Sequence, residues 1–234
     1  MTRPTLHAVI AETLGSAMLS AAVIGSGIMA ERLAGGNLAI ALLANTAATV
    51  AALFVLISVF APISGAHFNP AVTITLAIRD RQPWSRASAY IAAQIAGCCI
   101  GAQLAHLMFS LPLSQLSTHA RTGAGQWLSE IIATFGLLCV VLLTRRSQDA
   151  PWRVAAWIGA AYWFTASTSF ANPAITIARA MTDTFAGIRP GDVPAFIVAQ
   201  GVGALLAAGT VRVLGSEVRA RSDGTKDSER AGAG

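Results

Sequence analysis

The sequence predicts an all-α membrane protein in which six transmembrane helices and two re-entrant half-helices form an inverted repeat. Three observations support this prediction: the composition, the lengths of the apolar segments, and a repeat that divides the chain into two halves. Of the 234 residues, 54% are hydrophobic and 12% are charged, whereas soluble domains carry about 25% charged residues. The net charge of +5 comes from arginines between apolar segments, as in membrane proteins. This composition excludes a disordered chain and a nucleic-acid-binding protein.

Six apolar segments have the length of about 20 residues that a helix needs to cross a bilayer. They cover residues 6–30, 38–62, 87–110, 127–144, 152–170 and 193–215. The first could be a signal peptide, but it is long for one and contains Glu12, so we interpret it as a span. Arginine accumulates in cytoplasmic loops, and its distribution here favours a multi-pass protein of the cell (inner) membrane with both termini in the cytoplasm.

The chain forms one transmembrane domain, residues 1–216, built from two similar halves at about 5–110 and 127–215. Asn-Pro-Ala occurs once in each half, as Asn69, Pro70 and Ala71 and as Asn172, Pro173 and Ala174. Three spans per half give the halves opposite orientations, which is the inverted repeat seen in transporters. The polar residues 217–234 cannot bury apolar area and are predicted to be a disordered cytoplasmic tail.

Each Asn-Pro-Ala box precedes a short apolar stretch, residues 72–78 and 175–181, which predicts two half-helices that begin near the bilayer midplane. Asn is a favoured N-cap and Pro a favoured first helical residue. Two helix N-termini would place about +0.5 charge each at one point, which repels cations, protons included. We expect the side-chain NH₂ groups of Asn69 and Asn172 to be free to donate to uncharged, hydroxylated solutes in a pore.

The stretch Ser64–Thr73 closely resembles the first signature of the aquaporins and aquaglyceroporins, the major intrinsic proteins, and the resemblance covers about residues 5–215. It implies the aquaporin fold, a passive pore in every subunit, and a homotetramer in the lipid bilayer. It also implies that Glu12 and Glu130, which match the family's membrane glutamates, brace the carbonyls of the loops before the half-helices. His67 matches a family histidine at the inner pore mouth.

The sequence departs from the family directly after the second box, where Ile175 replaces an arginine of the constriction. The resemblance places the other constriction residues at Thr49, Ala160 and Ser169, with the register at Ala160 open by a residue or two. Such a constriction has no ring, no imidazole and no fixed cation, and it should be wide. Arg179 lies one helical turn after Ile175, where it either lines the outer mouth and partly replaces the missing charge or extends to water.

Residues 182–190 resemble a bacterial subgroup that is linked to arsenic handling. Because trivalent arsenic near neutral pH is largely uncharged As(OH)₃, the resemblance implies a channel for glycerol-like polyols, water and trivalent or methylated arsenicals that excludes protons and ions. A coupled secondary transporter and a water-selective aquaporin remain alternatives. The sequence contains no metal-ligand spacing, Ser/His pairing or phosphate loop. We therefore expect small neutral solutes as partners, and neither an enzyme, nor a cofactor, a metal site or a nucleic-acid partner.

Overall fold

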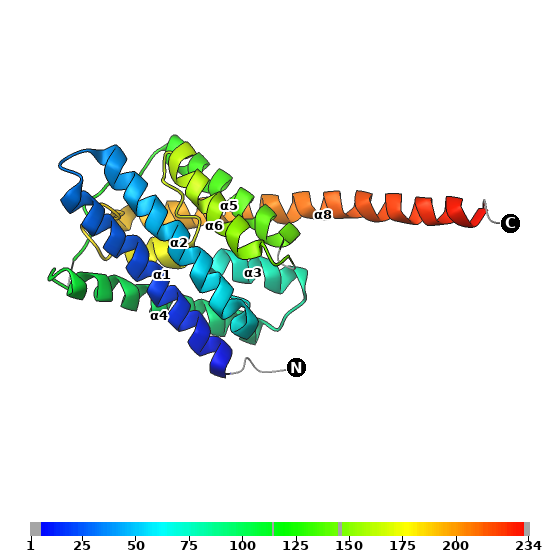
Figure 1. The fold of residues 1–234 in the computed structure, drawn as a ribbon, viewed down its shortest axis with the longest axis horizontal. Coiled ribbons are helices and arrows are strands. Elements are labelled where there is room, and N and C mark those ends of the chain that lie inside the picture. The colour runs from blue at the N-terminus through cyan, green and yellow to red at the C-terminus, as the bar shows by residue number, and fades with distance from the viewer. Residues whose placement is uncertain (1–5, 114, 145–146, 232–234) are drawn as a thin grey trace.

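The computed structural model describes residues 6–113, 115–144 and 147–231, and side chains as far as Leu214. The regular structure in these ranges is helical, as predicted (Figure 1). The elements are α1 (Leu6–Leu33), α2 (Leu38–Ser64), α3 (Pro70–Arg79), α4 (Trp84–Met108), α5 (Ala124–Thr144), α6 (Ala150–Phe164), α7 (Pro173–Arg179), the 3₁₀ turn η1 (Pro190–Asp192) and α8 (Val193–Ala231).

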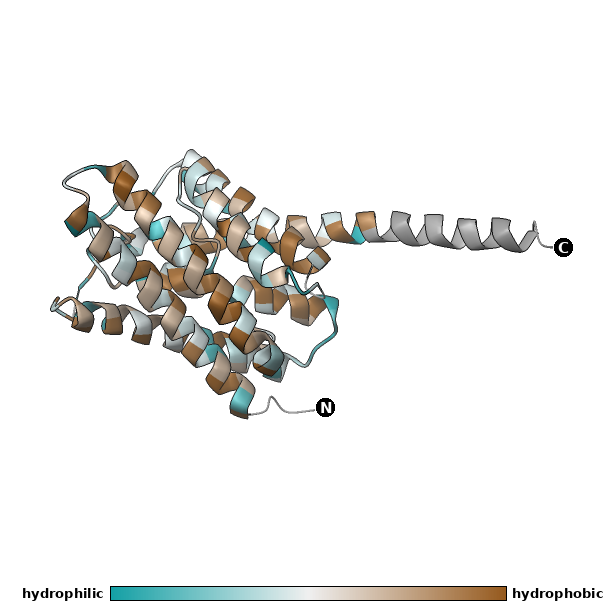
Figure 2. Ribbon diagram, in the orientation of Figure 1, coloured by the Kyte–Doolittle hydropathy of each residue, from teal (hydrophilic) through white to brown (hydrophobic). Residues whose placement is uncertain are grey.

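Five helical segments in the described part of the chain are long and apolar enough to cross a membrane. They are α1, α2, α4, α5 and the segment Pro190–Leu214, which includes the first part of α8. Hydrophobic residues cover much of the outward surface of these helices (Figure 2). An apolar exterior of this kind suits a protein whose solvent is the hydrocarbon core of a bilayer.

The remaining predicted span is shorter than expected. We predicted residues 152–170, but α6 has 15 residues and ends at Phe164, so it covers about 22 Å. The helix ends because Thr165 adopts an extended conformation, with φ of −107° and ψ of 139°, and Thr168 and Ser169 that follow are left-handed, with φ of 60° and 51°. This part of the chain forms the approach to the second Asn-Pro-Ala box instead.

The two half-helices also differ from each other in length. Helix α3 has 10 residues, whereas α7 has 7 and stops at Arg179, two residues before the predicted end of its apolar stretch. The backbone N–H groups of Ala180 and Met181 donate to Ile177 and Ala178, three residues back. This tighter 3₁₀ pattern ends the α-helix at that point.

The helices pack as two equivalent groups. Helix α1 packs against α2 and α4, and α5 packs in the same way against α6 and α8. Each half-helix contacts a long helix of the other half, α3 against α8 and α7 against α4. Glycines permit the closest contacts: a Cβ at Gly101 of α4 would lie 2.2 Å from the Ala17 carbonyl oxygen, and one at Gly203 of α8 would lie 2.4 Å from that of Ile131.

Helix α8 continues to Ala231, so it includes most of the segment for which we predicted disorder. No proline interrupts this segment, and alanine, arginine and glutamate within it favour helix. Its last residues, 232–234, lie outside the described residues. Figure 1 shows that α1 begins and α8 ends on the same side of the helical body.

Candidate solute pathway

A cavity of about 640 Å³ lies between the two halves of the protein. It is lined by Asn69 and Asn172 of the two boxes, by the half-helix residues Val72 and Ile175, and by side chains of α1, α2, α5 and α6. Most of these side chains are apolar. The fold therefore brings both boxes, which are about a hundred residues apart, to one cavity.

Both asparagines cap the half-helix that follows them. Asn69 Oδ1 accepts from Ala71 N at 2.9 Å, and Asn172 Oδ1 accepts from Ala174 N at 3.0 Å and from Ile175 N at 3.3 Å. Both asparagines are extended, and a proline occupies the first turn of each helix. These are the features by which Asn and Pro start a helix.

The two boxes are joined directly by their asparagine side chains. Asn69 Nδ2 donates to the carbonyl oxygen of Ala171 at 2.7 Å, and Asn172 Nδ2 donates to that of Phe68 at 2.8 Å. Our expectation that each NH₂ group is wholly free is therefore wrong. One N–H of each amide fixes the opposite loop, and one N–H remains for a solute in the cavity.

The buried carboxylate of Glu12 organises the loop before the first box. Its Oε1 accepts from Ser64 Oγ at 2.6 Å and from His67 N at 3.0 Å. Its Oε2 accepts from Phe68 N at 2.8 Å and from Gln94 Nε2 at 2.7 Å. We call these five residues the Glu12 cluster. Four donors satisfy a charge that would otherwise be costly to bury.

The second loop repeats this arrangement around Glu130. Oε1 accepts from Ser167 Oγ at 2.6 Å and from Phe170 N at 2.9 Å. Oε2 accepts from Ala171 N at 2.9 Å and from Gln200 Nε2 at 2.6 Å. We call these residues the Glu130 cluster. Both glutamates accept from backbone N–H groups, because a carboxylate is an acceptor. They therefore hold the loop carbonyls indirectly, through the neighbouring N–H groups of the same loop.

Left-handed residues turn the loop carbonyls toward the asparagines. Ala66 and Phe68 have φ of 48° and 49°, and the equivalent residues Ser169 and Ala171 have φ of 51° and 46°. This conformation is unfavourable for residues with a side chain, so surrounding bonds must hold it. The glutamate clusters supply these bonds, and as a result Phe68 and Ala171 present their carbonyl oxygens to the opposite box.

Four of the five predicted constriction residues line the cavity. They are Thr49, Ser169, Ile175 and Arg179. The fifth, Ala160, is exposed and is not part of the lining.

Two other residues of α6 line the cavity where Ala160 was expected. Ile158 and Tyr162 are separated by one helical turn and share a face, from which Ala160 points away. The Tyr162 hydroxyl lies 3.5 Å from Thr49 Oγ1. Tyr162 was missed because the register of the short α6 is not evident from its apolar sequence. The cavity lining therefore includes an aromatic ring on α6 that the sequence analysis did not place there.

Arg179 is buried, with 3% of its surface exposed, so the alternative in which it extends to water is wrong. Its guanidinium carbon lies 3.4 Å from the centroid of the Phe170 ring, and its Nε donates to the carbonyl of Ala186. A fixed cation is therefore part of the cavity lining, although the position directly after the box holds Ile175.

The segment after α7 is fastened to the loop between α4 and α5. Arg121 of that loop donates through Nε to the Gly187 carbonyl at 2.8 Å and through Nη1 to that of Ser167 at 3.3 Å. Burial lowers the pKa of the Arg121 guanidinium from its ordinary value. Nothing in the spacing of the sequence signalled this residue, because its partners lie far along the chain.

A second link in this region is exposed. Asp183 Oδ1 accepts from both the backbone N and the Oγ1 of Thr118, at 2.8 and 2.9 Å. Hydrogen bonds to the carboxylate favour its charged form, and they lower the pKa of Asp183.

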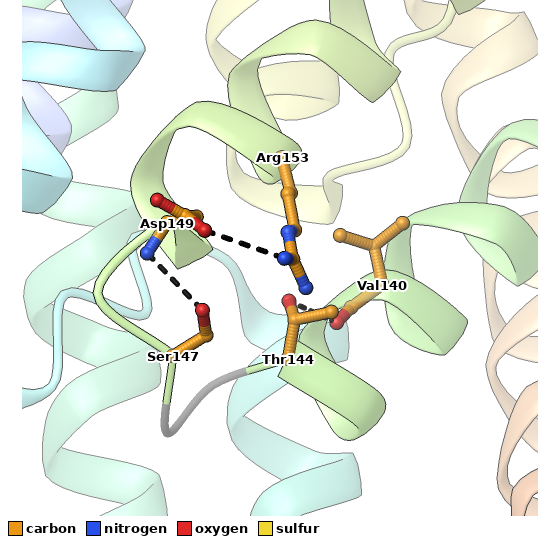
Figure 3. Close-up of polar contacts among 5 residues, drawn as sticks. All are labelled: Val140, Thr144, Ser147, Asp149 and Arg153. Atoms are coloured by element: carbon orange, nitrogen blue, oxygen red, sulfur yellow. Dashed lines mark hydrogen bonds and ion pairs between the residues drawn. The ribbon is translucent and has the colours of Figure 1, made fainter.

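The loop between α5 and α6 also reaches the cavity, through Ser147 and Gln148. Ser147 Oγ accepts from the backbone N of Asp149 at 3.2 Å, and the Asp149 carboxylate pairs with Arg153 at 3.3 Å (Figure 3). The predicted pore residue His67 lines the same cavity, and its Nδ1 lies 3.1 Å from Thr73 Oγ1.

Comparison with known proteins agrees with this geometry. The sequence pattern of the major intrinsic protein family matches residues 1–164. Aquaglyceroporin AqpS of Rhizobium meliloti is 52% identical over 207 residues, which cover 88% of this chain and 88% of AqpS. Aquaporin TIP1-1 of Zea mays is 35% identical over 144 residues, 59% of this chain and 57% of its own length.

A solved structure extends the comparison to the fold. The X-ray structure of the aquaglyceroporin from Plasmodium falciparum matches with a TM-score of 0.67, covering 88% of this chain and 95% of its own, at 20% identity. This likeness confirms the predicted aquaporin fold. Together with the sequence match, it shows that the chain belongs to the major intrinsic protein family.

Proposed function

We propose that the protein is a passive channel for small uncharged solutes, namely water, glycerol-like polyols and trivalent or methylated arsenicals. The observation that carries this proposal is that two capped half-helices begin at one cavity, which Asn69 and Asn172 both line. Each asparagine has one N–H left for a solute oxygen. A small hydroxylated molecule can exchange water for these donors as it passes.

The same geometry opposes cations and protons. The N-termini of α3 and α7 carry partial positive charge, and Arg179 adds a full positive charge to the lining. Glu12 and Glu130 do not offset this charge within the cavity, because both are fully buried, use four donors each and do not line it. A cation would lose its water without finding a carboxylate.

The buried glutamates also argue against a coupled secondary transporter. Coupling to protons requires an ionisable group that the proton can reach, and these carboxylates are closed off by their own loops. A water-selective aquaporin is less favoured because the predicted constriction combines the small side chains of Thr49 and Ser169 with Ile175.

The remaining parts of the proposal rest on resemblance. Arsenicals follow from residues 182–190 and from the chemistry of As(OH)₃, which presents hydroxyls as glycerol does. A homotetramer follows from the family, and the placement of both termini in the cytoplasm follows from the distribution of arginines. The start of α1 and the end of α8 lie on one side of the helical body, which supports this placement of the termini, and the apolar exterior supports a membrane location (Figures 1 and 2). Native mass spectrometry of the purified protein tests the tetramer.

The test of the channel is stopped-flow light scattering on reconstituted vesicles, with water, glycerol and arsenite measured in one preparation. We expect all three permeabilities to exceed those of protein-free vesicles and to be independent of proton and sodium gradients. We also expect each flux to rise linearly with the gradient of its own solute. Saturation at low concentration, or dependence on an ion gradient, would favour a coupled transporter. Water flux without glycerol flux would favour a water-selective aquaporin.

A further inference from the structure

Pro62 is the one proline that stands inside a helix, beyond its first turn, among the helices that the structure describes. It lies in the last turn of α2, four residues after Ser58. A proline has no backbone N–H, so the carbonyl oxygen of Ser58 lacks the donor that residue 62 supplies in a regular helix. The other prolines of the described helices stand in a first turn, where no helical bond is lost: Pro70, Pro151, Pro173, Pro190 and Pro194.

The face of α2 that carries this carbonyl lines the cavity. Ser58, Ala61 and Pro62 all belong to the lining, because residues three and four positions apart share a helix face. Within the described part of the chain, no side chain donates to the Ser58 carbonyl. A backbone acceptor without its helical donor is tolerated inside a membrane protein where it lines a water-filled cavity. The Ser58 carbonyl is therefore placed to accept from a molecule in the cavity.

The side chain of Ser58 adds a second acceptor. Its Oγ donates its proton to the Phe54 carbonyl at 2.7 Å, one turn back, so only the lone pairs of the hydroxyl remain for another partner. Ser58 is exposed, so these lone pairs can be reached. One residue thus offers two acceptors and no free side-chain donor, whereas the boxes offer the donors of Asn69 and Asn172.

These acceptors lie at the end of the cavity that is formed by the last turns of α2 and the start of α6. The Phe54 ring packs edge-on against the Trp152 ring of α6, with 6.3 Å between the ring centroids. The loop before α6 lines the same cavity through Ser147 and Gln148. Because most of the lining is apolar, a solute that leaves bulk water finds few side-chain acceptors there.

We propose that Ser58 forms an acceptor site, through its carbonyl oxygen and its Oγ, that binds the O–H and N–H groups of permeating neutral solutes. The inference rests on the proposed channel function and refines it: Asn69 and Asn172 bind solute oxygens, and the Ser58 site binds the solute's own donors. Polyols, urea and As(OH)₃ carry such donors. Pro62 creates the site, because any other residue at this position supplies an N–H to the Ser58 carbonyl.

The first test measures water, glycerol and urea permeability in reconstituted vesicles of wild type and Pro62→Ala. The alanine N–H pairs with the Ser58 carbonyl and removes one acceptor from the cavity. We expect glycerol and urea permeability to fall about fivefold, the effect of one hydrogen bond. Water should fall less, because a neighbouring water molecule can accept in place of the carbonyl. Ser58→Ala, which removes Oγ and keeps the carbonyl, should also lower glycerol and urea more than water.

Pro151→Ala is the matched control. Pro151 also lines the cavity, but it stands in the first turn of α6, where its missing N–H has no helical partner. The substitution removes the same ring from the lining and leaves every helical bond as it was. We expect the ratios of glycerol and urea permeability to water permeability to stay at the wild-type values.

The second test observes the Ser58 carbonyl directly. Serine followed by valine occurs once in the chain, at Ser58 and Val59. Protein labelled with ¹³C at the serine carbonyls and with ¹⁵N at valine therefore gives one coupled carbonyl signal in solid-state NMR of the vesicles. We expect this signal to move when glycerol is added to the wild type. In Pro62→Ala it should lie at the position of a hydrogen-bonded helical carbonyl and should not respond to glycerol.

The proposal is overturned if Pro62→Ala lowers water, glycerol and urea by the same factor or leaves them unchanged, because the effect is then structural or absent. It is also overturned if Pro151→Ala loses the solutes as fully, or if the wild-type Ser58 signal ignores glycerol in vesicles that conduct it. If the wild type conducts neither water nor glycerol above protein-free vesicles, the proposed channel function itself fails. The two failures are therefore distinguishable.

Discussion

The two halves of the protein have the same glutamate cluster before the Asn-Pro-Ala box, but they differ in the half-helix and loop that follow the box. The Glu12 and Glu130 clusters match bond for bond: each carboxylate accepts from a serine, a glutamine and two consecutive backbone N–H groups. Each glutamine also donates to a half-helix threonine at 2.9 Å, Gln94 to Thr73 and Gln200 to Thr176. The repeated part holds the two boxes together at the centre of the cavity.

The halves differ beyond the boxes. The first half-helix has 10 residues and ends at Arg79, whose Nη1 donates to the Leu142 carbonyl at 2.8 Å, whereas the second has 7 and ends at the buried Arg179. The segment after Arg179 is bonded to the α4–α5 loop through Arg121 and Asp183. Under the proposed channel function, we expect the repeated clusters to maintain the pore and the unrepeated end at Arg179 to decide which solutes pass.

The largest effect should follow from removing one cluster. Glu12→Gln and Glu130→Gln keep the side-chain volume but replace an acceptor by a donor that faces other donors, which costs about 3 kcal/mol or more in each half. We expect both variants to lose thermal stability in detergent by a similar amount, as measured by differential scanning fluorimetry. Glu31→Gln, at an exposed carboxylate that accepts from Phe185 N at 3.2 Å, is the control.

If only one of these two variants is destabilised, the Glu12 and Glu130 clusters do not contribute equally to stability. In that case the bonds of the other cluster would be incidental to the fold, and the equivalence of the two loops would be geometric rather than energetic.

A smaller effect, confined to solute permeability, should come from Ile175→Arg, which places a second cation in the cavity lining one turn from Arg179. It narrows the cavity beside Arg179, so we expect glycerol and arsenite permeability to fall about fivefold and water permeability to fall less. Ile175→Val, which adds neither bulk nor charge, is the matched control. Unchanged glycerol and arsenite uptake in Ile175→Arg would remove Ile175 from the constriction.

The sequence predicted the parts of the fold that depend on local patterns. Apolar length located the spans, and Asn-Pro located both half-helix starts, because Asn69 and Asn172 cap through their own neighbours. The prediction failed where the local structure depends on residues that are distant in the sequence. The chain after the early end of α6 is held by Ser129 and Glu130 of another helix, which accept from Ala166 N and Phe170 N. The bond from Asn69 to Ala171 joins residues 102 positions apart.

The candidate site shows the same limit. Thr49, Ser169 and Ile175 were placed in the lining through the family resemblance, but Tyr162 and the burial of Arg179 were not foreseen. Both depend on how α6 rotates and on how the α4–α5 loop covers α7, which no short-range signal encodes.

The smallest expected effect concerns two loops, the one after α7 (the outer loop) and the one between α5 and α6 (the inner loop), and how their contributions to stability depend on pH. The folded pKa of Asp183 is lowered, so its carboxylate stabilises the protein above the unfolded pKa of about 3.9, and this contribution is lost as pH falls through the folded pKa. Asp183→Asn should therefore lower the melting temperature slightly at pH 7 and leave it unchanged near pH 2.

The inner loop provides the comparison for this experiment. Asp149→Asn removes the exposed pair with Arg153 (Figure 3), and exposed pairs contribute little. We expect a smaller change at pH 7 than for Asp183→Asn. A larger change in the inner-loop variant would contradict the view that the outer loop is the more firmly bonded of the two.

The most direct test of the central claim introduces negative charge where the N-termini of α3 and α7 meet. In the double variant Asn69→Asp and Asn172→Asp, aspartate still caps each half-helix but has no N–H, either for solutes or for the carbonyl of the opposite loop. Glycerol flux and proton flux, the latter from a pH-sensitive dye inside the same vesicles, are measured for wild type and variant. We predict that glycerol permeability falls about tenfold while proton conductance rises above the wild-type baseline. Unchanged glycerol and proton fluxes in the variant would contradict the claim that the two capped boxes form the selective centre of a neutral-solute channel.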